Sequence, residues 1–215
     1  MRRCVIIGAS PETDTVQWAS WVRKDDFIMC ADGGYVLAQQ AGLTPQLIIG
    51  DFDSAAVPAA PPCEVIRLPV KKDDTDTMYC IKEGMRRGFR SFLLLGMTGG
   101  RPDHTFANFA ALTYLSQRKC QGIIMDTEWC YCALTDDKMI LKGCQNSRFA
   151  VFPFGCAGCR VSLSGFLYEG ANIDLSADYP VGVSNTILSD SAAVQVEGTA
   201  LLMFTQPSNG QFKSI

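Results

Sequence analysis

The sequence contains a single histidine, His104, and this scarcity excludes several kinds of catalytic site. A site built on two or more histidines, such as the HExxH motif of zinc proteases, is impossible in this chain. A Ser–His or Cys–His nucleophile pair has only His104 to use. The motifs GxxxxGK[ST] and GxGxxG are also absent, so the chain is neither a P-loop protein nor a standard dinucleotide binder.

The sequence also has no strong excess of positive or negative charge and no long apolar run. Lys and Arg number 19 against 22 Asp and Glu, and this balance argues against a nucleic-acid partner, because nucleic-acid binders are usually basic. No apolar run approaches the roughly 18 residues that span a bilayer. The apolar run before Gly8 is also too short for a signal peptide. We therefore expect a cytoplasmic protein with no membrane partner, whose cysteines stay reduced.

The first 126 residues alternate short apolar runs with helix-like stretches. The runs cover 4–7, 27–30, 47–49, 65–66, 92–95 and 123–125. Each run is continuous and bounded by Gly, Asp or Pro, which is typical of strands buried on both faces. Helices are expected over 13–24, 34–42, 75–87 and 103–118, with Asp74 and Thr75 as caps of the third. This order predicts an α/β domain over residues 1–126, with a doubly wound, mostly parallel sheet.

From residue 127 onward the pattern changes, because charged residues become sparser and helical periodicity disappears. Short strands are expected over 129–134, 139–141, 148–152, 160–163, 193–196 and 201–204. Asp136 and Asp137 are interpreted as a hairpin turn between the first two. Many short strands separated by turn residues predict an all-β domain over residues 127–215, a small antiparallel β-sandwich.

Carboxylates follow the predicted parallel strands, at the edge where doubly wound sheets bind ligands. They are Asp32, Asp51, Asp53, Asp73, Asp74 and Asp76. Any one aspartate after a strand is often only a turn former or a helix cap. Crowded carboxylates repel one another unless a cation neutralises them, and oxygen ligands without a histidine cluster favour Mg²⁺ over zinc. The gathering of these carboxylates on one edge therefore predicts a Mg²⁺ site.

The segment TGGRPDH carries features that suit a phosphate group. Backbone at Gly99 and Gly100 can approach an anion closely, and Arg101 can donate two parallel hydrogen bonds to phosphate oxygens. The N–H groups at the start of the following helix point toward the same place. His104 and Asn108 are four residues apart and therefore share one helical face. The bland alternatives are a surface ion pair for Arg101 and a capping or packing role for His104.

Two pairs of cysteines raise the alternative of a structural zinc site. They are Cys130 with Cys132 and Cys156 with Cys159. The first spacing is shorter than the usual C-x₂₋₄-C of zinc sites. Buried free thiols are therefore the expected state of these residues.

In combination these motifs resemble the thiamine pyrophosphokinase (thiamine diphosphokinase) family. The resemblance rests on ADGG, GDFDS, KDDTD and TGGRPDHTFAN, and on the later GFLY (165–168) and VGVSNT (181–186). It covers nearly the whole chain in order. It implies a nucleotide domain, a C-terminal β domain, and a homodimer with thiamine sites between subunits. One departure is Trp129, which stands where related bacterial sequences tend to have Asn in Asp-x-x-Asn.

The resemblance implies a role for each motif. Asp51, Asp53 and Asp76 would hold Mg²⁺, with Asp73 close by, and Arg101 and Asp103 would contact ATP. Tyr168 would stack on the pyrimidine ring of thiamine, and Ser184 and Asn185 would help to form its pocket. Together with the phosphate-binding features above, the expected ATP-binding set is Asp32, Gly99, Gly100, Arg101, Asp103, His104 and Asn108.

The implied reaction transfers a diphosphoryl group from ATP to the hydroxyl of thiamine, giving thiamine diphosphate and AMP. The expected catalytic residues are Asp73, Asp76, Arg101 and Asp103, and either Asp73 or Asp103 could accept the hydroxyl proton. Three alternatives remain open. They are a diphosphokinase acting on another heterocyclic alcohol such as a pterin, a nucleotide-binding sensor without catalysis, and a metal-dependent phosphohydrolase.

Overall fold

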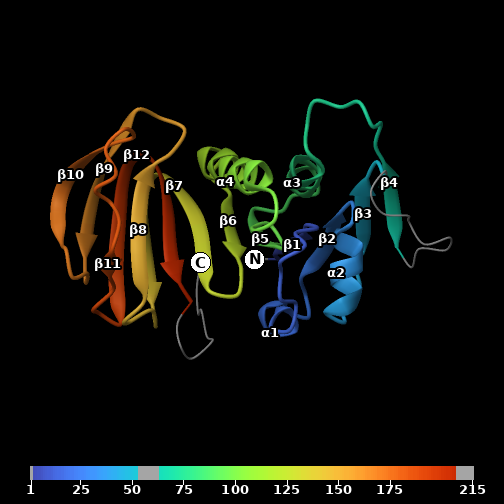
Figure 1. Ribbon diagram of the computed structural model, residues 1–215, viewed down its shortest axis with the longest axis horizontal. Coiled ribbons are helices and arrows are strands. Elements are labelled where there is room, and N and C mark those ends of the chain that lie inside the picture. Colours follow the sequence, from blue (N-terminus) through green and yellow to red (C-terminus); the bar gives the residue numbers. More distant parts are fainter. Residues whose placement is uncertain (1, 53–62, 207–215) are drawn as a thin grey trace. The chain divides into compact units, whose positions relative to one another are not determined.

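Five short apolar segments near the start of the chain form parallel strands (Figure 1). They are β1 (Cys4–Ile7), β2 (Phe27–Ala31), β3 (Leu47–Gly50), β4 (Glu64–Arg67) and β5 (Ser91–Leu95). Their order across the sheet is β5-β1-β2-β3-β4, and each neighbouring pair is parallel. Every residue of β1 and β3 is buried, so both faces of these strands are covered, as their continuous apolar sequences predict.

Three helices lie in the connections between these strands. They are α1 (Trp18–Trp21), α2 (Gly34–Gln40) and α3 (Asp76–Arg86), and both α2 and α3 contact β1 and β2. Thr75 caps α3 as predicted, because its side chain accepts a hydrogen bond from the backbone N–H of Met78 at 3.2 Å. The helix predicted over 13–24 was wrong in extent. The Asp14 carboxylate accepts a hydrogen bond from Val16 N–H at 2.9 Å, a local turn that competes with a helical start.

An antiparallel arrangement follows in the second half of the chain. β7 (Trp129–Lys142) and β12 (Ser191–Thr205) pair along most of their length. On its other edge, β12 pairs first with β9 (Gly158–Ser164) and then with β8 (Arg148–Pro153). β10 (Gly170–Ser176) pairs with β9, and the two-residue β11 (Asn185–Thr186) pairs with β8. The predicted fold class is confirmed, with a parallel α/β part followed by antiparallel strands.

The expected hairpin turn at Asp136 and Asp137 is wrong, because both residues lie inside β7. Asp136 has a left-handed φ of 46°, and the pairing with β12 shifts register between Val196 and Thr199. The Asp136 carboxylate accepts a hydrogen bond from Gly198 N–H at 2.7 Å. The turn-forming residues therefore make a β-bulge that lets both strands continue.

The computed structural model describes residues 2–52 and 63–206, and their contacts form two units. The N-terminal unit holds the described residues up to Asn108 together with Ile124–Thr127. The C-terminal unit holds Phe109–Ile123 and the described residues from Glu128 onward. Both α4 (Pro102–Gln117) and β6 (Gln121–Met125) contribute residues to each unit. The domain ranges 1–126 and 127–215 stay a prediction.

Each unit has its own apolar core. In the N-terminal unit the core includes the residues of β1 and β3 and Trp18, which is completely buried. In the C-terminal unit the rings of Phe149 and Phe166 lie 4.7 Å apart, close to the buried strand residues of β8. Within the described ranges, none of the helices is both long enough and apolar enough to cross a membrane.

Candidate active site

The order of the parallel strands creates a crevice at one edge of the sheet. The chain runs outward from β1 to β4 and then returns, so that β5 pairs with the opposite side of β1. The segments that leave β1 and β5 therefore diverge at the carboxyl ends of these strands, where open α/β sheets bind ligands. Two backbone hydrogen bonds join the segments at their start, from Gly8 N–H to Leu95 O at 2.8 Å and from Ser10 N–H to Gly96 O at 3.1 Å.

A pocket of about 410 Å³ lies at this crevice. It is lined by Gly8, Ala9, Ser10, Pro11, Asp32, Gly33, Thr77, Gly96, Met97, Gly99, Arg101, His104 and Asn108. Five of the residues expected to bind ATP are therefore brought together here. The sequence analysis missed the contribution of the segment after β1, although its position directly after the first strand could have indicated it.

The glycines of the predicted phosphate segment have the backbone conformation that glycine permits. Gly99 and Gly100 have φ values of +88° and +64°, in the left-handed region. A Cβ atom at Gly100 would lie 2.8 Å from the Pro11 ring, so this position also adjoins the segment after β1. Asn108 is buried and donates from Nδ2 to Met97 O at 2.8 Å, which anchors the start of the same loop.

Arg101 and Asp103 form an exposed ion pair at the start of α4. The Arg101 guanidinium donates to the two Asp103 carboxylate oxygens at 3.2 and 2.6 Å. These hydrogen bonds lower the pKa of Asp103 below its ordinary value. Both side chains are about two-thirds exposed, at 68% and 64%, so the pair is screened by water and open to exchange for a ligand.

A second group of charged side chains surrounds Lys72. Its Nζ lies 2.6 Å from Asp51 Oδ2, just after β3, and 2.7 Å from Asp76 Oδ1, the first residue of α3. Burial lowers the pKa of Lys72, but the two carboxylates outweigh this and raise it above its ordinary value. The sequence analysis missed Lys72, although its position four residues before Asp76 was a signal.

Asp32 connects the pocket with these carboxylates. It follows β2 with a left-handed φ of 44° and lines the pocket. Burial raises its pKa, the N–H groups of Gly33 and Phe52 lower it, and the charges of Asp76 and Asp51 raise it further. The net result is a raised pKa, with burial as the largest cause.

The remaining acidic residues of this region are placed differently. Asp73 is exposed and lies outside the ion pairs of Lys72, and Asp74 pairs instead with Lys82 at 2.5 Å. Asp53 lies outside the described residues. Of the acidic residues predicted here, the structure therefore gathers Asp32, Asp51 and Asp76.

The donor atoms of this group suit a hard cation such as Mg²⁺. Asp32 Oδ1 and Asp76 Oδ1 are buried and accept no hydrogen bond, although Lys72 lies close to the latter. In the described part of the chain, no three Asp, Glu, His or Cys side chains are grouped as a metal site. This does not conflict with Mg²⁺, which usually takes only one or two carboxylates and completes its shell with phosphate oxygens and water.

The three residues expected to bind thiamine lie together in the C-terminal unit. Asn185 donates from Nδ2 to Tyr168 O at 2.9 Å and accepts from Tyr168 N–H at 3.0 Å. Ser184, next to it, has a left-handed φ of 60°. Asn185 is buried while Tyr168 is 65% exposed, so a buried amide fixes the backbone beneath an exposed aromatic ring.

The cysteines and Trp129 take structural positions. Cys132 and Cys159 are free thiols, and burial raises the pKa of Cys132 to about 12 and that of Cys159 to about 11. Such thiols are poor sources of the thiolate that zinc requires. Trp129 begins β7, and the Arg148 guanidinium lies 5.1 Å from the centre of its ring. The strand therefore starts normally despite the departure at this position.

Comparison with known proteins agrees with this arrangement. Residues 18–124 match the family model described as "Thiamin pyrophosphokinase, catalytic domain". The thiamine pyrophosphokinase of Bacillus subtilis (strain 168) is 22% identical over 211 residues, which cover 94% of this chain and 98% of that protein.

Solved structures show the same fold. The thiamine pyrophosphokinase from Bacillus subtilis has a TM-score of 0.83 at 20% identity, over 96% of this chain and 100% of that one. The enzyme from Geobacillus thermodenitrificans has a TM-score of 0.81 at 23% identity, over 97% and 100%. The thiamin pyrophosphokinase from Candida albicans has a TM-score of 0.79 at 16% identity, over 95% and 88%. The chain therefore belongs to the thiamine pyrophosphokinase family.

Proposed function

We propose that this protein transfers a diphosphoryl group from ATP to the hydroxyl of thiamine, releasing AMP. The observation that carries the proposal is the pocket at the carboxyl ends of β1 and β5, which joins a glycine-rich anion segment to a group of carboxylates. A nucleotide with several phosphates needs both features. The glycine-rich segment donates hydrogen bonds to the phosphate oxygens, and the carboxylates hold a cation that offsets the phosphate charge. Family membership supports the same reaction.

In this proposal the chain positions the phosphates and offsets their charge. Arg101 exchanges its contact with Asp103 for phosphate oxygens, and the first N–H groups of α4 point to the same place. His104 lines the same pocket, and Asn108 holds the loop in place. Mg²⁺, when bound, would be held by Asp51, Asp53 and Asp76, and it would neutralise charge on the phosphates.

A carboxylate must accept the proton of the attacking hydroxyl, and Asp73 and Asp103 are the candidates. The hydrogen bonds from Arg101 lower the pKa of Asp103, which makes it a weaker base while that pair persists. Asp73 lies at the surface just before α3, and none of the ion pairs among the described residues of this region occupies its carboxylate. We therefore favour Asp73 as the proton acceptor.

Thiamine would bind through the C-terminal unit. The exposed ring of Tyr168 offers a face for the pyrimidine, and a cationic ligand gains from such a contact. Ser184 and Asn185 border the same segment, and Asn185 fixes it through two hydrogen bonds. We further propose that the active form is a homodimer with the thiamine site between subunits.

The test is an AMP-release assay with ATP, Mg²⁺ and thiamine, run beside a pterin alcohol. We expect AMP only with thiamine, and a loss of at least about 100-fold in rate for Asp51→Asn and for Asp76→Asn, as for other electrostatic groups at phosphoryl-transfer sites. Asp174→Asn, on β10, removes a carboxylate of the C-terminal unit and serves as the control.

Each other outcome has a distinct meaning. Wild-type rates in folded Asp51→Asn and Asp76→Asn proteins would contradict the metal assignment. AMP formed only with the pterin would change the acceptor, and ATP binding without AMP would indicate a sensor. Phosphate release without any acceptor would indicate a hydrolase.

A further inference from the structure

Lys72 has a position that an ordinary surface lysine does not have. Its side chain is only 8% exposed, and its two carboxylate partners, Asp51 and Asp76, are 10% and 25% exposed. The ammonium lies 2.6 Å and 2.7 Å from oxygens of these partners. A buried ion of this kind is costly unless its partners compensate for lost water, so the three groups depend on one another.

Lys72 carries one positive charge, which is fewer than the negative charges of the carboxylates near it. Asp32 lies close to this group, because a Cβ atom at Gly50, the residue before Asp51, would lie 3.0 Å from Asp32 Oδ1. Two carboxylates, those of Asp51 and Asp76, therefore share one ammonium, and a third carboxylate lies nearby. Without any cation they would repel strongly in a partly buried place. Lys72 relieves the repulsion between Asp51 and Asp76.

The two carboxylates that Lys72 contacts are also among those proposed to hold a divalent cation. Mg²⁺ requires oxygen ligands at about 2.0–2.1 Å in a near-octahedral shell, so a bound cation would compete with the ammonium for the same two carboxylates. A lysine side chain has four flexible carbons and a compact charge, so it can move without a change in the backbone. Thr77, next to Asp76, lines the nucleotide pocket, so phosphate oxygens would be within reach of a displaced ammonium.

We propose that Lys72 is an internal counter-cation, which holds the acidic edge together in the metal-free protein and moves to phosphate oxygens when a divalent cation binds. Lys72 is thus a positioning residue that couples loading of the metal to loading of the nucleotide. This inference rests on the proposed function for the identity of the ligands. It follows from the two ion pairs, their burial and the shared carboxylates.

The first test compares Lys72→Gln with the wild-type protein, without ATP or thiamine. We expect the melting temperature of the metal-free variant to fall, because Asp51 and Asp76 lose their counter-cation. We also expect Mn²⁺, measured by electron paramagnetic resonance, to bind about tenfold more tightly, a size typical of coupled sites. Lys82→Gln, which removes an exposed pair with Asp74, is the matched control and should leave Mn²⁺ affinity unchanged.

Lys72→Arg separates charge from geometry. It keeps a cation between the carboxylates, so the metal-free melting temperature should stay near that of the wild type. Mn²⁺ affinity should also stay near the wild-type value. If Lys72→Gln binds Mn²⁺ no more tightly than the wild type, Lys72 is a structural ion pair only and the proposal is wrong.

A second measurement uses the wild-type protein, so it does not depend on a variant that folds. The rate at which an amine-specific acetylating reagent modifies Lys72 is followed by mass spectrometry, with and without Mn²⁺. We expect slow modification of the buried amine in the metal-free protein and faster modification with Mn²⁺. An unchanged rate with saturating Mn²⁺ would overturn the proposal.

The two proposals can fail separately. The melting, Mn²⁺ and labelling experiments use neither thiamine nor ATP, so they can succeed even if no AMP is formed with thiamine. Conversely, activity with thiamine but no competition between Lys72 and Mn²⁺ would support the proposed function and contradict the proposed role of Lys72.

Discussion

Gly182 shows how one residue can control the segment that carries the proposed substrate contacts. Its backbone O accepts a hydrogen bond from Val151 N–H at 2.8 Å, which ties the segment to β8. A Cβ atom at Gly182 would lie 1.8 Å from Val151 O, far inside contact distance. Only glycine fits between these two backbones, and Ser184 and Asn185 follow directly.

We predict that Gly182→Ala destabilises the protein by about 2–3 kcal/mol, because the two backbones must separate. Urea unfolding measures this. Gly42→Ala is the control, since a Cβ there meets open space and only its left-handed φ of 69° costs energy. Equal effects of the two substitutions would show that the close approach at Gly182 does not exist in solution.

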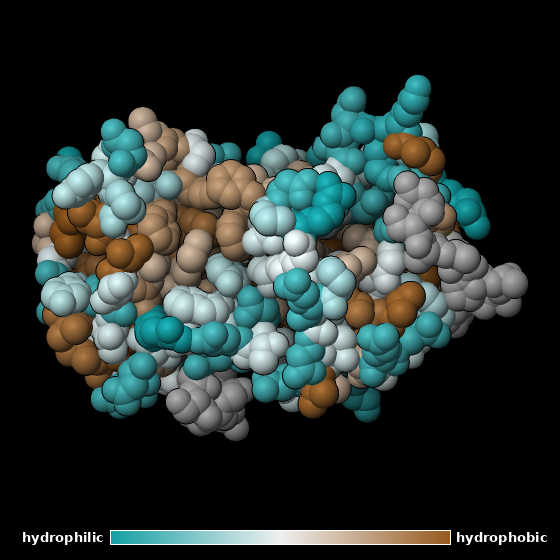
Figure 2. Space-filling view, in the orientation of Figure 1, coloured by the Kyte–Doolittle hydropathy of each residue, from teal (hydrophilic) through white to brown (hydrophobic). Residues whose placement is uncertain are grey.

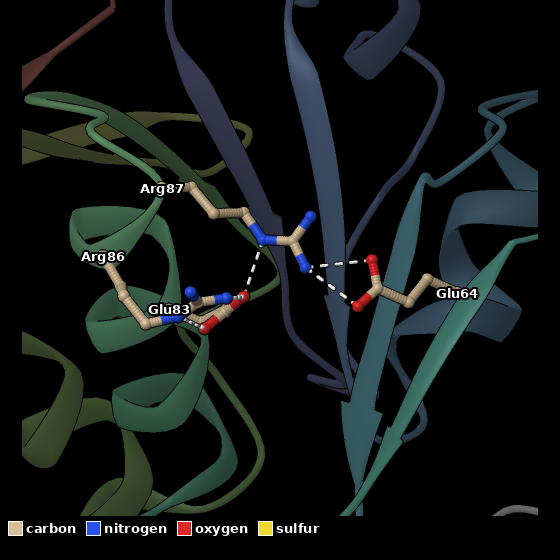
Figure 3. A network of polar contacts seen from close by, with 4 residues as sticks. All are labelled: Glu64, Glu83, Arg86 and Arg87. Atoms are coloured by element: carbon tan, nitrogen blue, oxygen red, sulfur yellow. Dashed lines mark hydrogen bonds and ion pairs between the residues drawn. The ribbon is translucent and has the colours of Figure 1, made fainter.

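Arg87 joins α3 to β4 through two carboxylates, as Figure 3 shows. Its guanidinium donates to Glu83 at 2.6 Å and to both oxygens of Glu64 at 2.9 Å. Arg86 adds two hydrogen bonds to Glu83 at 2.7 Å. The hydrogen bonds from Arg86, followed by those from Arg87, lower the pKa of Glu83 from 4.5 to about 2.

A lowered pKa in the folded state predicts acid sensitivity. The stabilisation by Glu83 is complete above its unfolded pKa of 4.5 and is lost as pH falls toward about 2. Glu83→Gln should therefore make the free energy of unfolding fall less steeply over this pH range, as measured by urea unfolding. Arg86→Gln should give a smaller change of the same sign, because Arg87 remains. An unaltered slope in Glu83→Gln would contradict the assigned pKa.

At the scale of elements, the bulge between β7 and β12 decides the shape of the C-terminal strands. Before the bulge β12 pairs with β9, and after it β12 pairs with β8, while β7 follows it on the other edge. A single long strand, β12, thus forms hydrogen-bonded pairs with β9 in its first part and with β8 in its second part. The Asp136 side chain takes the Gly198 N–H that the shifted register leaves without a ladder partner.

Replacing Asp136 tests this role. Asp136→Ala loses the hydrogen bond to Gly198 and keeps a strained left-handed residue, so we predict a loss of about 1–2 kcal/mol in unfolding free energy. Asp136→Asn retains an acceptor and tolerates the conformation, so it should cost less. Urea unfolding of both variants measures the difference. A harmless Asp136→Ala would contradict a stabilising role for the hydrogen bond between Asp136 and Gly198.

The helices show why some elements were predictable and others were not. α3 carries its own signals, a capping Thr75, an acidic first turn and a basic last turn, and it begins within one residue of the predicted position. α1 lacks a side-chain cap and ends after four residues. β11, with two residues, has no periodicity to detect and exists because it pairs with β8. Local signals therefore predict elements that are stable locally.

At the scale of the whole molecule, exposed apolar surface indicates a partner. Most of the exposed large apolar side chains among the described residues lie in one stretch of the C-terminal unit. They are Leu167, Tyr168, Tyr179, Val181, Val183 and Leu188. Figure 2 shows apolar groups on this part of the surface, over the C-terminal strands. Such a concentration is typical of an interface, which agrees with the proposed homodimer.

Sedimentation velocity tests the dimer. We predict a dimer for the wild-type protein and a monomer for Val181→Asp, because a carboxylate would be buried at the interface. Val16→Asp is the matched control, since Val16 is an exposed valine of the N-terminal unit at 83% exposure. A wild-type monomer at micromolar concentration, or a dimer of Val181→Asp, would contradict the proposal.

The sequence alone determined the parallel α/β part, the antiparallel part, and the list of carboxylates at the sheet edge. This was possible because a strand buried on both faces must be apolar throughout, and because the residues after parallel strands meet at one edge. Tertiary structure alone decided that Lys72 lies between Asp51 and Asp76, and that Asn185 holds Tyr168. It also decided that β7 continues through Asp136. These contacts join residues from different elements of the fold. Periodicity in a sequence indicates only whether a residue is buried, not which other residue it contacts.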